Sequence, residues 1–235
     1  MNKIRDVYHR LFKAYSRQGW WPVTPDGELT PQYFVPAITE KQKFEIIIGA
    51  ILTQNTSWKN VEKAIIQLNK ASLIDIKKIR NIDKDFLANL IRSSGYYNEK
   101  AKKVKAIAEF LNNNTIANIG KMQTQELRNL LLSVKGVGPE TADSILLYAL
   151  DKPIFVIDAY TRRLVERMGI IKDTKKIDYA ELQKLFMRNL PKSISIYKEY
   201  HALIVRHAKE HCRKSPVCSG CILMCKYKTL NNPAV

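Results

Sequence analysis

Residues 132–143 read Leu-Ser-Val-Lys-Gly-Val-Gly-Pro-Glu-Thr-Ala-Asp and decide the architecture of this chain. Apolar residues at helical spacing lead into Gly136-Val137-Gly138. Pro139 follows, and proline suits the first turn of a new helix. The two glycines permit backbone angles closed to other residues and leave the turn without side chains. The stretch predicts two helices joined by a tight hairpin. Its amides at a helix N-terminus suit an anion such as a phosphate, unless the hairpin is only a connection.

Helical periodicity continues on both sides of this hairpin, with apolar residues recurring every three or four positions. Residues 17–40 contain four prolines and two tryptophans and are predicted to be irregular. Only residues 154–157 resemble a strand, so the chain is predicted to be all-α. The predicted helices are 2–16, 41–54, 57–70, 85–93, 99–112, 124–134, 139–150, 159–168, 178–189 and 193–211.

The charge balance indicates the kind of partner. Lys and Arg number 39 against 22 Asp and Glu, a net charge of +17. Nucleic acid is favoured because each neutralised phosphate releases counterions, although a solvated lysine-rich surface is the alternative. The N-terminus has no continuous apolar core, and the longest apolar run, residues 46–52, is too short to span a bilayer. We therefore predict a cytoplasmic, nucleoid-associated protein with no membrane partner.

Asp158 lies 18 residues after Glu140, directly before a predicted helix, where aspartate is a common N-cap. A hairpin followed at this distance by an aspartate in a Val-x-Asp context resembles the helix–hairpin–helix DNA glycosylase superfamily, which includes endonuclease III. The resemblance extends from about Trp20 to Cys225. It implies two helical lobes: a six-helix barrel lobe at 38–152, and a lobe formed by 1–37 with 153–235.

The same resemblance implies an activity on double-stranded DNA containing damaged bases, with the chain acting as a monomer. The damaged nucleotide is flipped out of the duplex. Ionised Asp158 then stabilises an oxocarbenium-like transition state and orients the attacking water. A non-catalytic DNA-binding hairpin protein is the alternative from another class, and Asp158 argues against it.

Glu140 separates two subclasses of this superfamily. The bifunctional endonuclease III enzymes carry a lysine at this position, and that lysine forms a Schiff base with the sugar before strand cleavage. Glutamate cannot form an imine, so we predict a monofunctional glycosylase without AP-lyase activity. Glu140 also suits the first turn of a helix electrostatically, and another lysine in the chain could replace the missing one.

Several further segments match regions with which the superfamily contacts DNA. Ile51-Leu52-Thr53-Gln54-Asn55-Thr56 resembles its minor-groove loop, with Gln54 matching the residue that fills the space left by the flipped base. Residues 94–98 followed by Lys100-Ala101 resemble a glycine turn beside the DNA backbone. The residues predicted to contact DNA are Gln54, Asn55, Lys135, Gly136, Gly138, Arg162 and Arg163.

The base pocket is predicted from Trp20, Trp21 and Phe44, which resemble the 3-methyladenine glycosylase branch. That branch also has glutamate at the Glu140 position. An alkylated purine is cationic and labile, so electron-rich rings would favour it. Tryptophans near helices also serve as core anchors, which is the plainer interpretation. The predicted substrates are therefore alkylated purines such as 3-methyladenine, with oxidised pyrimidines or mismatched uracil or thymine as the alternative.

All four cysteines, Cys212, Cys218, Cys221 and Cys225, lie within fourteen residues and predict a metal site. Zinc and an iron–sulfur cluster both use four cysteines. The resemblance favours a 4Fe–4S cluster of structural role, presenting Arg213, Lys214 and Lys226 to phosphates. The gaps of five, two and three residues are tighter than the family's first and last gaps. Zinc therefore stays open, including a mixed site with His207 and His211, which with Lys209 otherwise face DNA or the lobe interface.

Overall fold

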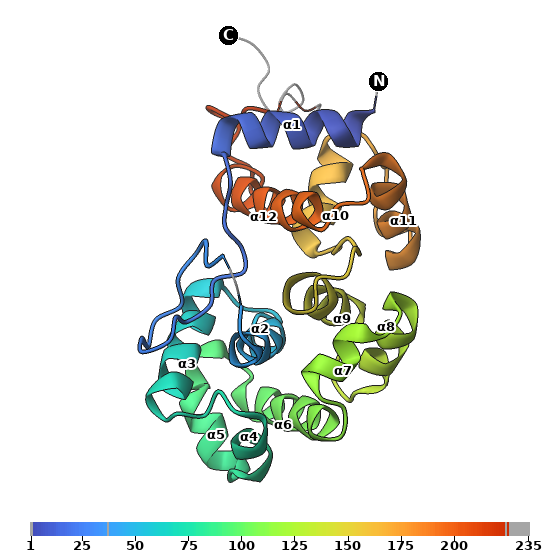
Figure 1. The fold of residues 1–235 in the computed structure, drawn as a ribbon. Helices are drawn as coiled ribbons and strands as arrows, with labels where there is room; N and C mark the ends of the chain where they lie inside the picture. The colour runs from blue at the N-terminus through green and yellow to red at the C-terminus, as the bar shows by residue number, and fades with distance from the viewer. Residues whose placement is uncertain (1, 37, 224, 226–235) are drawn as a thin grey trace. The chain divides into compact units, whose positions relative to one another are not determined.

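The computed structural model describes residues 2–36, 38–223 and 225, so Lys226 lies outside it. Within those ranges the regular structure is helical, and the β-structure is limited to an isolated antiparallel bridge between Val23 and Gln32. The all-α prediction is confirmed. The chain forms two compact units (Figure 1): unit 1 is Met1–Trp20 with Pro153–Val235, and unit 2 is Trp21–Lys152. No helix in the described ranges has the length and apolar character needed to cross a membrane.

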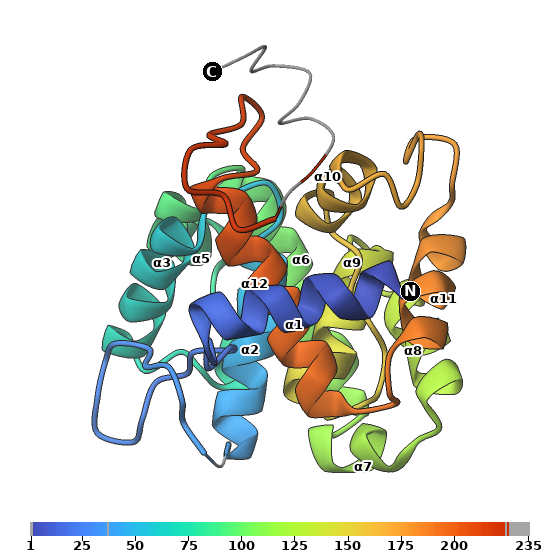
Figure 2. The same ribbon diagram turned by 90° about the horizontal axis from the view of Figure 1, so that it is seen from above.

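Unit 1 is built from α1 (Lys3–Tyr15), α10 (Ala159–Arg167), α11 (Tyr179–Asn189) and α12 (Ile194–Glu210). In Figure 2, α1 crosses α12, which also packs against α10. Ile4, Val7 and Leu11 of α1 are buried, as their helical spacing on one face predicts. Phe155, from the extended segment before α10, stacks on Phe186 of α11 with ring centroids 4.4 Å apart. These contacts form the core that carries α10.

Unit 2 is organised around α2 (Glu40–Leu52), which packs against helices from both early and late parts of this unit's sequence. This helix is apolar around most of its circumference and buried from Phe44 to Leu52, as expected for a central helix. Its N-terminus is fixed by a capping box between Thr39 and Gln42. The surrounding elements are α3 (Trp58–Lys70), α4 (Ile76–Asn81), α5 (Lys84–Leu90), η1 (Arg92–Ser94), α6 (Tyr97–Asn113), α7 (Ile116–Lys121), α8 (Thr124–Ser133), α9 (Pro139–Ser144) and η2 (Ile145–Ala149).

Two short helices and one change of helix type were not predicted. Helices α4 and α7 have six residues each, too few to show apolar periodicity, and they depend on the side-chain caps Asp75 and Thr115. The helix predicted at 139–150 begins as expected at Pro139, but residues 145–149 follow π-helical geometry. The long helices agree with the prediction within a few residues at each end.

The segment from Trp21 to the start of α2 belongs to unit 2, whereas we predicted it with the chain termini. The backbone amide and hydroxyl of Thr24 donate to Glu45 Oε1 at 2.8 and 3.0 Å. Gln42 Nε2 donates to the Thr24 carbonyl at 3.0 Å. Because these partners are buried in unit 2, their hydrogen bonds hold the segment there. The six-helix barrel implied by the resemblance stays a prediction.

Candidate functional site

The hairpin between α8 and α9 is a compact turn with an exposed tip. Val134 and Val137 are buried beneath it, and the Val137 amide donates to the Val134 carbonyl at 3.0 Å. Gly136 has a φ of +88°, in the region that favours glycine. A Cβ at Gly138 would meet no atom within 4 Å. The packing of the protein therefore does not require a glycine at Gly138, and the position is open to another molecule.

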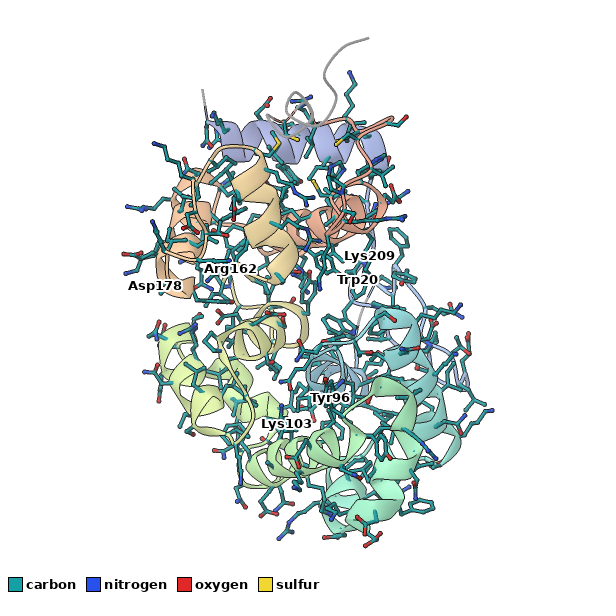
Figure 3. The ribbon with its side chains drawn as sticks, turned by 180° about the vertical axis from the view of Figure 1, so that it is seen from behind. Trp20, Tyr96, Lys103, Arg162, Asp178 and Lys209 are labelled. Carbon is teal, nitrogen blue, oxygen red and sulfur yellow. The ribbon has the colours of Figure 1, made fainter. Side chains whose placement is uncertain are left out.

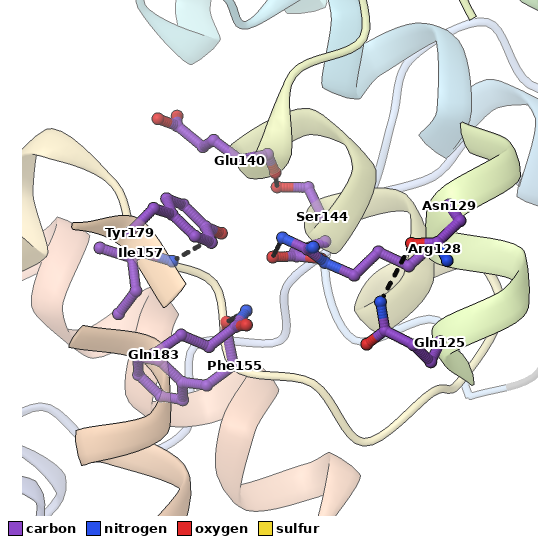
Figure 4. A network of polar contacts seen from close by, with 10 residues as sticks. Gln125, Arg128, Asn129, Glu140, Ser144, Phe155, Ile157, Tyr179 and Gln183 are labelled. Atoms are coloured by element: carbon purple, nitrogen blue, oxygen red, sulfur yellow. Dashed lines mark hydrogen bonds and ion pairs between the residues drawn. The ribbon is translucent and has the colours of Figure 1, made fainter. Parts of the chain in front are cut away.

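An ion pair fixes the two hairpin helices to each other. Arg128 of α8, labelled in Figure 4, donates to both carboxylate oxygens of Asp143 in α9, at 2.6 and 3.2 Å. Asp143 is fully buried. Removing one partner from a buried pair costs several kcal/mol, so this contact holds the hairpin geometry. Glu140 lies on the exposed side of α9, where its carbonyl accepts from Ser144 Oγ at 2.8 Å.

Gln54, in the loop after α2, lies against the hairpin. Its side-chain Nε2 donates to the Gly136 carbonyl at 3.1 Å and to Thr141 Oγ1 at 2.9 Å. Lys103 Nζ on α6 donates to Gln54 Oε1 at 2.6 Å. Asn55 is exposed, with a φ of +54°. The sequence indicated Gln54 and the hairpin separately, but nothing in it indicated Lys103.

Lys100 is a buried lysine that joins two loops. Its Nζ donates to the Leu52 carbonyl at the end of α2 and to the Ser94 carbonyl, at 2.8 and 2.6 Å. The second bond anchors the turn that ends in Tyr96, which has a φ of +47° and is 75% exposed. Tyr96 and Lys103 are labelled in Figure 3. Burial lowers the pKa of Lys100 to about 8.

We expect Lys100→Met to change how stability depends on pH. Between about pH 8 and the ordinary lysine pKa of 10.5, the unfolded chain binds the proton that folded Lys100 has lost, so wild-type stability rises with pH. Lys100→Met removes this rise, which amounts to at most about 3 kcal/mol. Urea unfolding of both proteins at several pH values measures it. Lys77→Met, at an exposed position, should show the same pH dependence of stability as the wild type. If Lys100→Met also shows the wild-type pH dependence, the pKa of Lys100 is not lowered in the folded protein.

Trp21 packs into an aromatic cluster within unit 2. Its ring is edge-on to Trp58 and Tyr148, with centroids 5.6 and 5.3 Å away. A Cβ at Gly49 would lie only 3.2 Å from the Trp21 ring, so a glycine here allows the ring to lie against α2. Trp58 and Tyr148 were missed as neighbours of Trp21, because aromatic residues on helical stripes cannot be distinguished by sequence from ordinary core residues.

The three aromatic residues predicted to form a pocket are not brought together within either unit. Phe44 is 1% exposed and belongs to the core around α2. Trp21 is half-buried in unit 2, whereas Trp20 belongs to unit 1. The packing therefore makes Phe44 a core residue of unit 2 and not an exposed pocket wall.

Asp158 caps α10 and is nearly buried, with 8% of its surface exposed. Its Oδ1 accepts from the Thr161 amide and hydroxyl at 2.6 and 2.8 Å. Oδ2 lies 3.5 Å from His201 Nε2. Burial raises the pKa of Asp158, but the bonds from His201 and Thr161 outweigh it and hold the pKa below its usual 3.8. The group is therefore a desolvated carboxylate that is ionised at neutral pH.

Two side-chain bonds fix the extended segment before Asp158, and Figure 4 shows both. The Ile157 amide donates to the Tyr179 hydroxyl at 3.2 Å, and Gln183 Nε2 donates to the Phe155 carbonyl at 2.6 Å. Lys209 of α12 interacts electrostatically with Asp158, whose charge opposes the lowering of the Lys209 pKa by burial. Sequence reasoning did not connect α12 with Asp158, since no local pattern relates them.

The two arginines predicted to contact phosphates have partners inside unit 1. Arg162 Nη1 donates to the Thr174 and Ile177 carbonyls at 2.7 and 3.0 Å. Arg163 Nε donates to the Cys212 carbonyl at 2.6 Å. Both therefore fix loops to α10. Lys135 is exposed beside the hairpin glycines.

Several backbone carbonyls of the loop that carries the four cysteines accept hydrogen bonds from arginines on helices. Besides Arg163, Arg167 Nη2 donates to the Lys214 carbonyl at 3.0 Å, and Arg10 Nη2 donates to the Ile222 carbonyl at 2.6 Å. All four cysteines are free thiols, and Cys212 is buried. Burial raises the pKa of the Cys221 thiol, and the charges of the other three cysteines raise it further.

His207 is fully buried beside this loop. Its Nε2 lies 3.7 Å from Cys221 Sγ, and its Nδ1 lies 3.0 Å from the Tyr15 hydroxyl. Burial lowers its pKa to about 4, so the ring is neutral. Within the described ranges, no three His, Cys, Asp or Glu side chains are grouped as a site for a single metal ion. The donor chemistry, four thiols carried by one anchored loop, is of the kind that binds an iron–sulfur cluster or zinc.

Comparisons with known proteins identify the family of this chain. Residues 48–192 match the family model described as HhH-GPD superfamily base excision DNA repair protein. The chain is 46% identical over 223 residues to "Putative DNA repair glycosylase MJ1434" of Methanocaldococcus jannaschii, covering 93% of this chain and 92% of that one. It is 30% identical over 188 residues to endonuclease III of Sulfolobus acidocaldarius, covering 78% and 82%.

A solved structure adds to this similarity. H. pylori 3-methyladenine DNA glycosylase (MagIII), bound to 1,N6-ethenoadenine, superposes with a TM-score of 0.69 and 28% identity, covering 89% of this chain and 97% of that one. The resemblance inferred from the hairpin and Asp158 is confirmed. The chain belongs to the HhH-GPD superfamily of base-excision DNA repair proteins and is a DNA glycosylase.

Proposed function

We propose that the protein excises alkylated purines such as 3-methyladenine from double-stranded DNA by hydrolysis, without cleaving the strand. The observation that carries the hydrolytic part is Asp158, a desolvated carboxylate held ionised at a helix N-terminus by Thr161 and His201. A fixed negative charge stabilises the positive charge that develops on the sugar as the glycosidic bond breaks. Because its hydrogen bonds are already formed, the carboxylate need not reorganise during the reaction.

DNA binding is assigned to the exposed hairpin and its neighbours. The open surface at Gly138 allows a phosphate to approach the backbone amides, and Lys135 adds positive charge. Gln54 contacts the hairpin, and it and its exposed neighbour Asn55 would meet the minor groove. Arg162 and Arg163 would contact phosphates through guanidinium N–H groups other than those that donate to the Thr174, Ile177 and Cys212 carbonyls.

Alkylated purines are favoured by two observations. Trp21 is half-buried and supported by Trp58 and Tyr148, so a cationic base could stack on an electron-rich face. The similar H. pylori enzyme is named a 3-methyladenine DNA glycosylase. Trp20 and Trp21 are therefore kept as base-contact residues. Because Phe44 is buried in the core of unit 2, it would act indirectly, by supporting α2.

Release of bases from a panel of defined duplexes tests the substrate. The panel contains 3-methyladenine, 7-methylguanine, an oxidised pyrimidine, and uracil or thymine opposite guanine. We expect the methylpurines to be released. Release of only pyrimidines would instead support the second candidate, an endonuclease III-like glycosylase, which the similarity to the S. acidocaldarius enzyme favours.

We expect no covalent adduct when the wild-type protein is treated with borohydride on damaged DNA. Glu140 occupies the lysine position and cannot form the imine that borohydride traps. Glu140→Lys should gain a trapped adduct, since position 140 is exposed on α9. Gel electrophoresis under denaturing conditions detects the adduct. An adduct with the wild-type protein would show that another lysine acts as nucleophile and that the enzyme is a lyase.

Cys212, Cys218, Cys221 and Cys225 would hold a 4Fe–4S cluster, with zinc as the alternative. The cluster would supply four metal–thiolate bonds that stabilise the loop and take no part in base removal. The arginines on α1 and α10 would fix the loaded loop to unit 1. A brown preparation with about four irons per chain is expected; a colourless protein with one zinc would overturn this assignment.

A further inference from the structure

His207 of α12 contacts the loop that carries the four cysteines in two places, through its backbone and through its ring. Its carbonyl accepts from the Cys212 amide at 3.2 Å, at the point where this loop begins. Its ring Nε2 lies 3.7 Å from Cys221 Sγ. The side chain is fully buried, so water cannot take the place of either contact.

The neighbours of Cys221 and His207 determine which atom donates in the contact between them. The Leu223 carbonyl can only accept, so the Cys221 thiol donates its proton there, at 3.2 Å. The sulfur therefore presents lone pairs to His207, and Nε2 carries the hydrogen. Because a neutral histidine has one N–H, Nδ1 is left as an acceptor and accepts from the Tyr15 hydroxyl at 3.0 Å.

Tyr15, the last residue of α1, is itself held beside α12. The Arg206 guanidinium lies over its ring, 4.8 Å from the centroid. Glu210 also contacts the Tyr15 hydroxyl, but Arg206 Nε donates to Glu210 Oε1 at 3.1 Å. Since Glu210 is paired with Arg206, the hydroxyl proton of Tyr15 is available to His207 Nδ1.

The place of His207 in the metal site follows from the number of thiols. Four thiolates complete the coordination of zinc or of a 4Fe–4S cluster, so His207 is not required as a ligand. A cysteine that ligates a metal is a thiolate, which has no proton and can only accept. The hydrogen bond from Nε2 to the Cys221 sulfur therefore already has the direction that a thiolate requires.

We infer that His207 donates a hydrogen bond to the Cys221 thiolate in the metal-bound protein and slows loss of the metal, with Tyr15 as its positioning residue. The inference rests on the proposed ligation by the four cysteines and is independent of the base that is excised. Cysteine ligands must stay deprotonated to hold a metal, and a hydrogen bond to the thiolate opposes its protonation. Helix α1 thus contributes to metal retention, although it carries no cysteine.

Release of metal from the purified holoprotein tests the inference without a measurement of enzyme activity. A chromogenic chelator in excess, bathophenanthroline for iron or pyridylazoresorcinol for zinc, reports the release rate. His207→Phe keeps a ring and removes both nitrogens, so release should be roughly 10- to 100-fold faster, the usual effect of losing an outer-shell partner. His207→Gln offers an amide N–H at similar reach and should stay within roughly 3-fold of the wild type.

Two further variants separate the bond to sulfur from general anchoring of the loop. Tyr15→Phe removes the hydroxyl that positions the ring and should speed release roughly 3- to 10-fold, the effect of one hydrogen bond. The matched control is His211→Phe, because His211 Nδ1 lies 3.1 Å from the Val217 carbonyl of the same loop. That contact is exposed, so water can replace it and release should stay within roughly 3-fold. Equal acceleration by His207→Phe and His211→Phe, or no acceleration by His207→Phe, overturns the inference.

The reduction potential gives a second readout for an iron–sulfur cluster, because hydrogen bonds to the sulfurs stabilise its reduced, more negative state. His207→Phe should lower the potential, and His207→Gln should keep it near the wild-type value. A potential that is the same in all three proteins contradicts the bond to sulfur.

Metal content and base release on the same preparations distinguish the possible failures. Wild-type protein isolated with neither iron nor zinc contradicts the ligand assignment and, with it, this inference. Loaded variants that all release metal at the wild-type rate contradict this inference alone. Failure to release methylpurine from DNA contradicts the proposed substrate alone. Circular dichroism of each variant confirms that it is folded.

Discussion

Asp158→Asn lowers the single-turnover rate of base release by at least about 10²- to 10³-fold, the effect of removing one preorganised electrostatic contact from a transition state. Asparagine caps helices as well as aspartate does, so α10 and the bond from Thr161 should persist. The variant loses only the negative charge that opposes the developing cation. Affinity for an abasic-site duplex should change little.

A matched control is available in the same unit. Asp178 caps α11 and accepts from the Glu181 amide at 2.6 Å, but it is exposed. Figure 3 labels it. Asp178→Asn removes an equivalent N-cap charge and should leave base release unchanged. Full activity of Asp158→Asn in a folded protein would remove the catalytic assignment.

Phe44→Ala lowers the free energy of unfolding by about 3–5 kcal/mol, the typical cost of removing a buried aromatic side chain. The ring is 1% exposed on the central helix of unit 2, so its loss leaves a cavity that α2 cannot easily close. Chemical denaturation monitored by circular dichroism measures the change.

Phe86→Ala serves as the comparison. Because Phe86 lies on α5 with 52% of its surface exposed, this substitution should lower the free energy of unfolding by well under about 1 kcal/mol. At a temperature where Phe44→Ala stays folded, we expect most of the base-release rate to remain. Unchanged stability with a large loss of affinity for methylated DNA would instead return Phe44 to the base pocket.

Local chemistry explains why so much of the fold could be predicted. Apolar spacing, the N-cap at Asp158 and the pair Gly138-Pro139 act within a few residues, and they located the long helices and the hairpin. Helices α4 and α7 were missed because six residues carry less than two turns of pattern. The segment after Trp20 was assigned to the wrong unit, since only its bonds to α2 show where it belongs.

The candidate site divides in the same way. The sequence by itself determined that Asp158 begins a helix at a set distance from a glycine hairpin, that Glu140 replaces a lysine, and that four thiols share one loop. Only the tertiary structure decided that His201 approaches Asp158, that Phe44 is buried, and that Lys103 donates to Gln54 beside the hairpin. The reason is physical: helix formation and capping depend on neighbours along the chain. Burial, charge pairing and the direction of an amide depend on residues that only packing brings together.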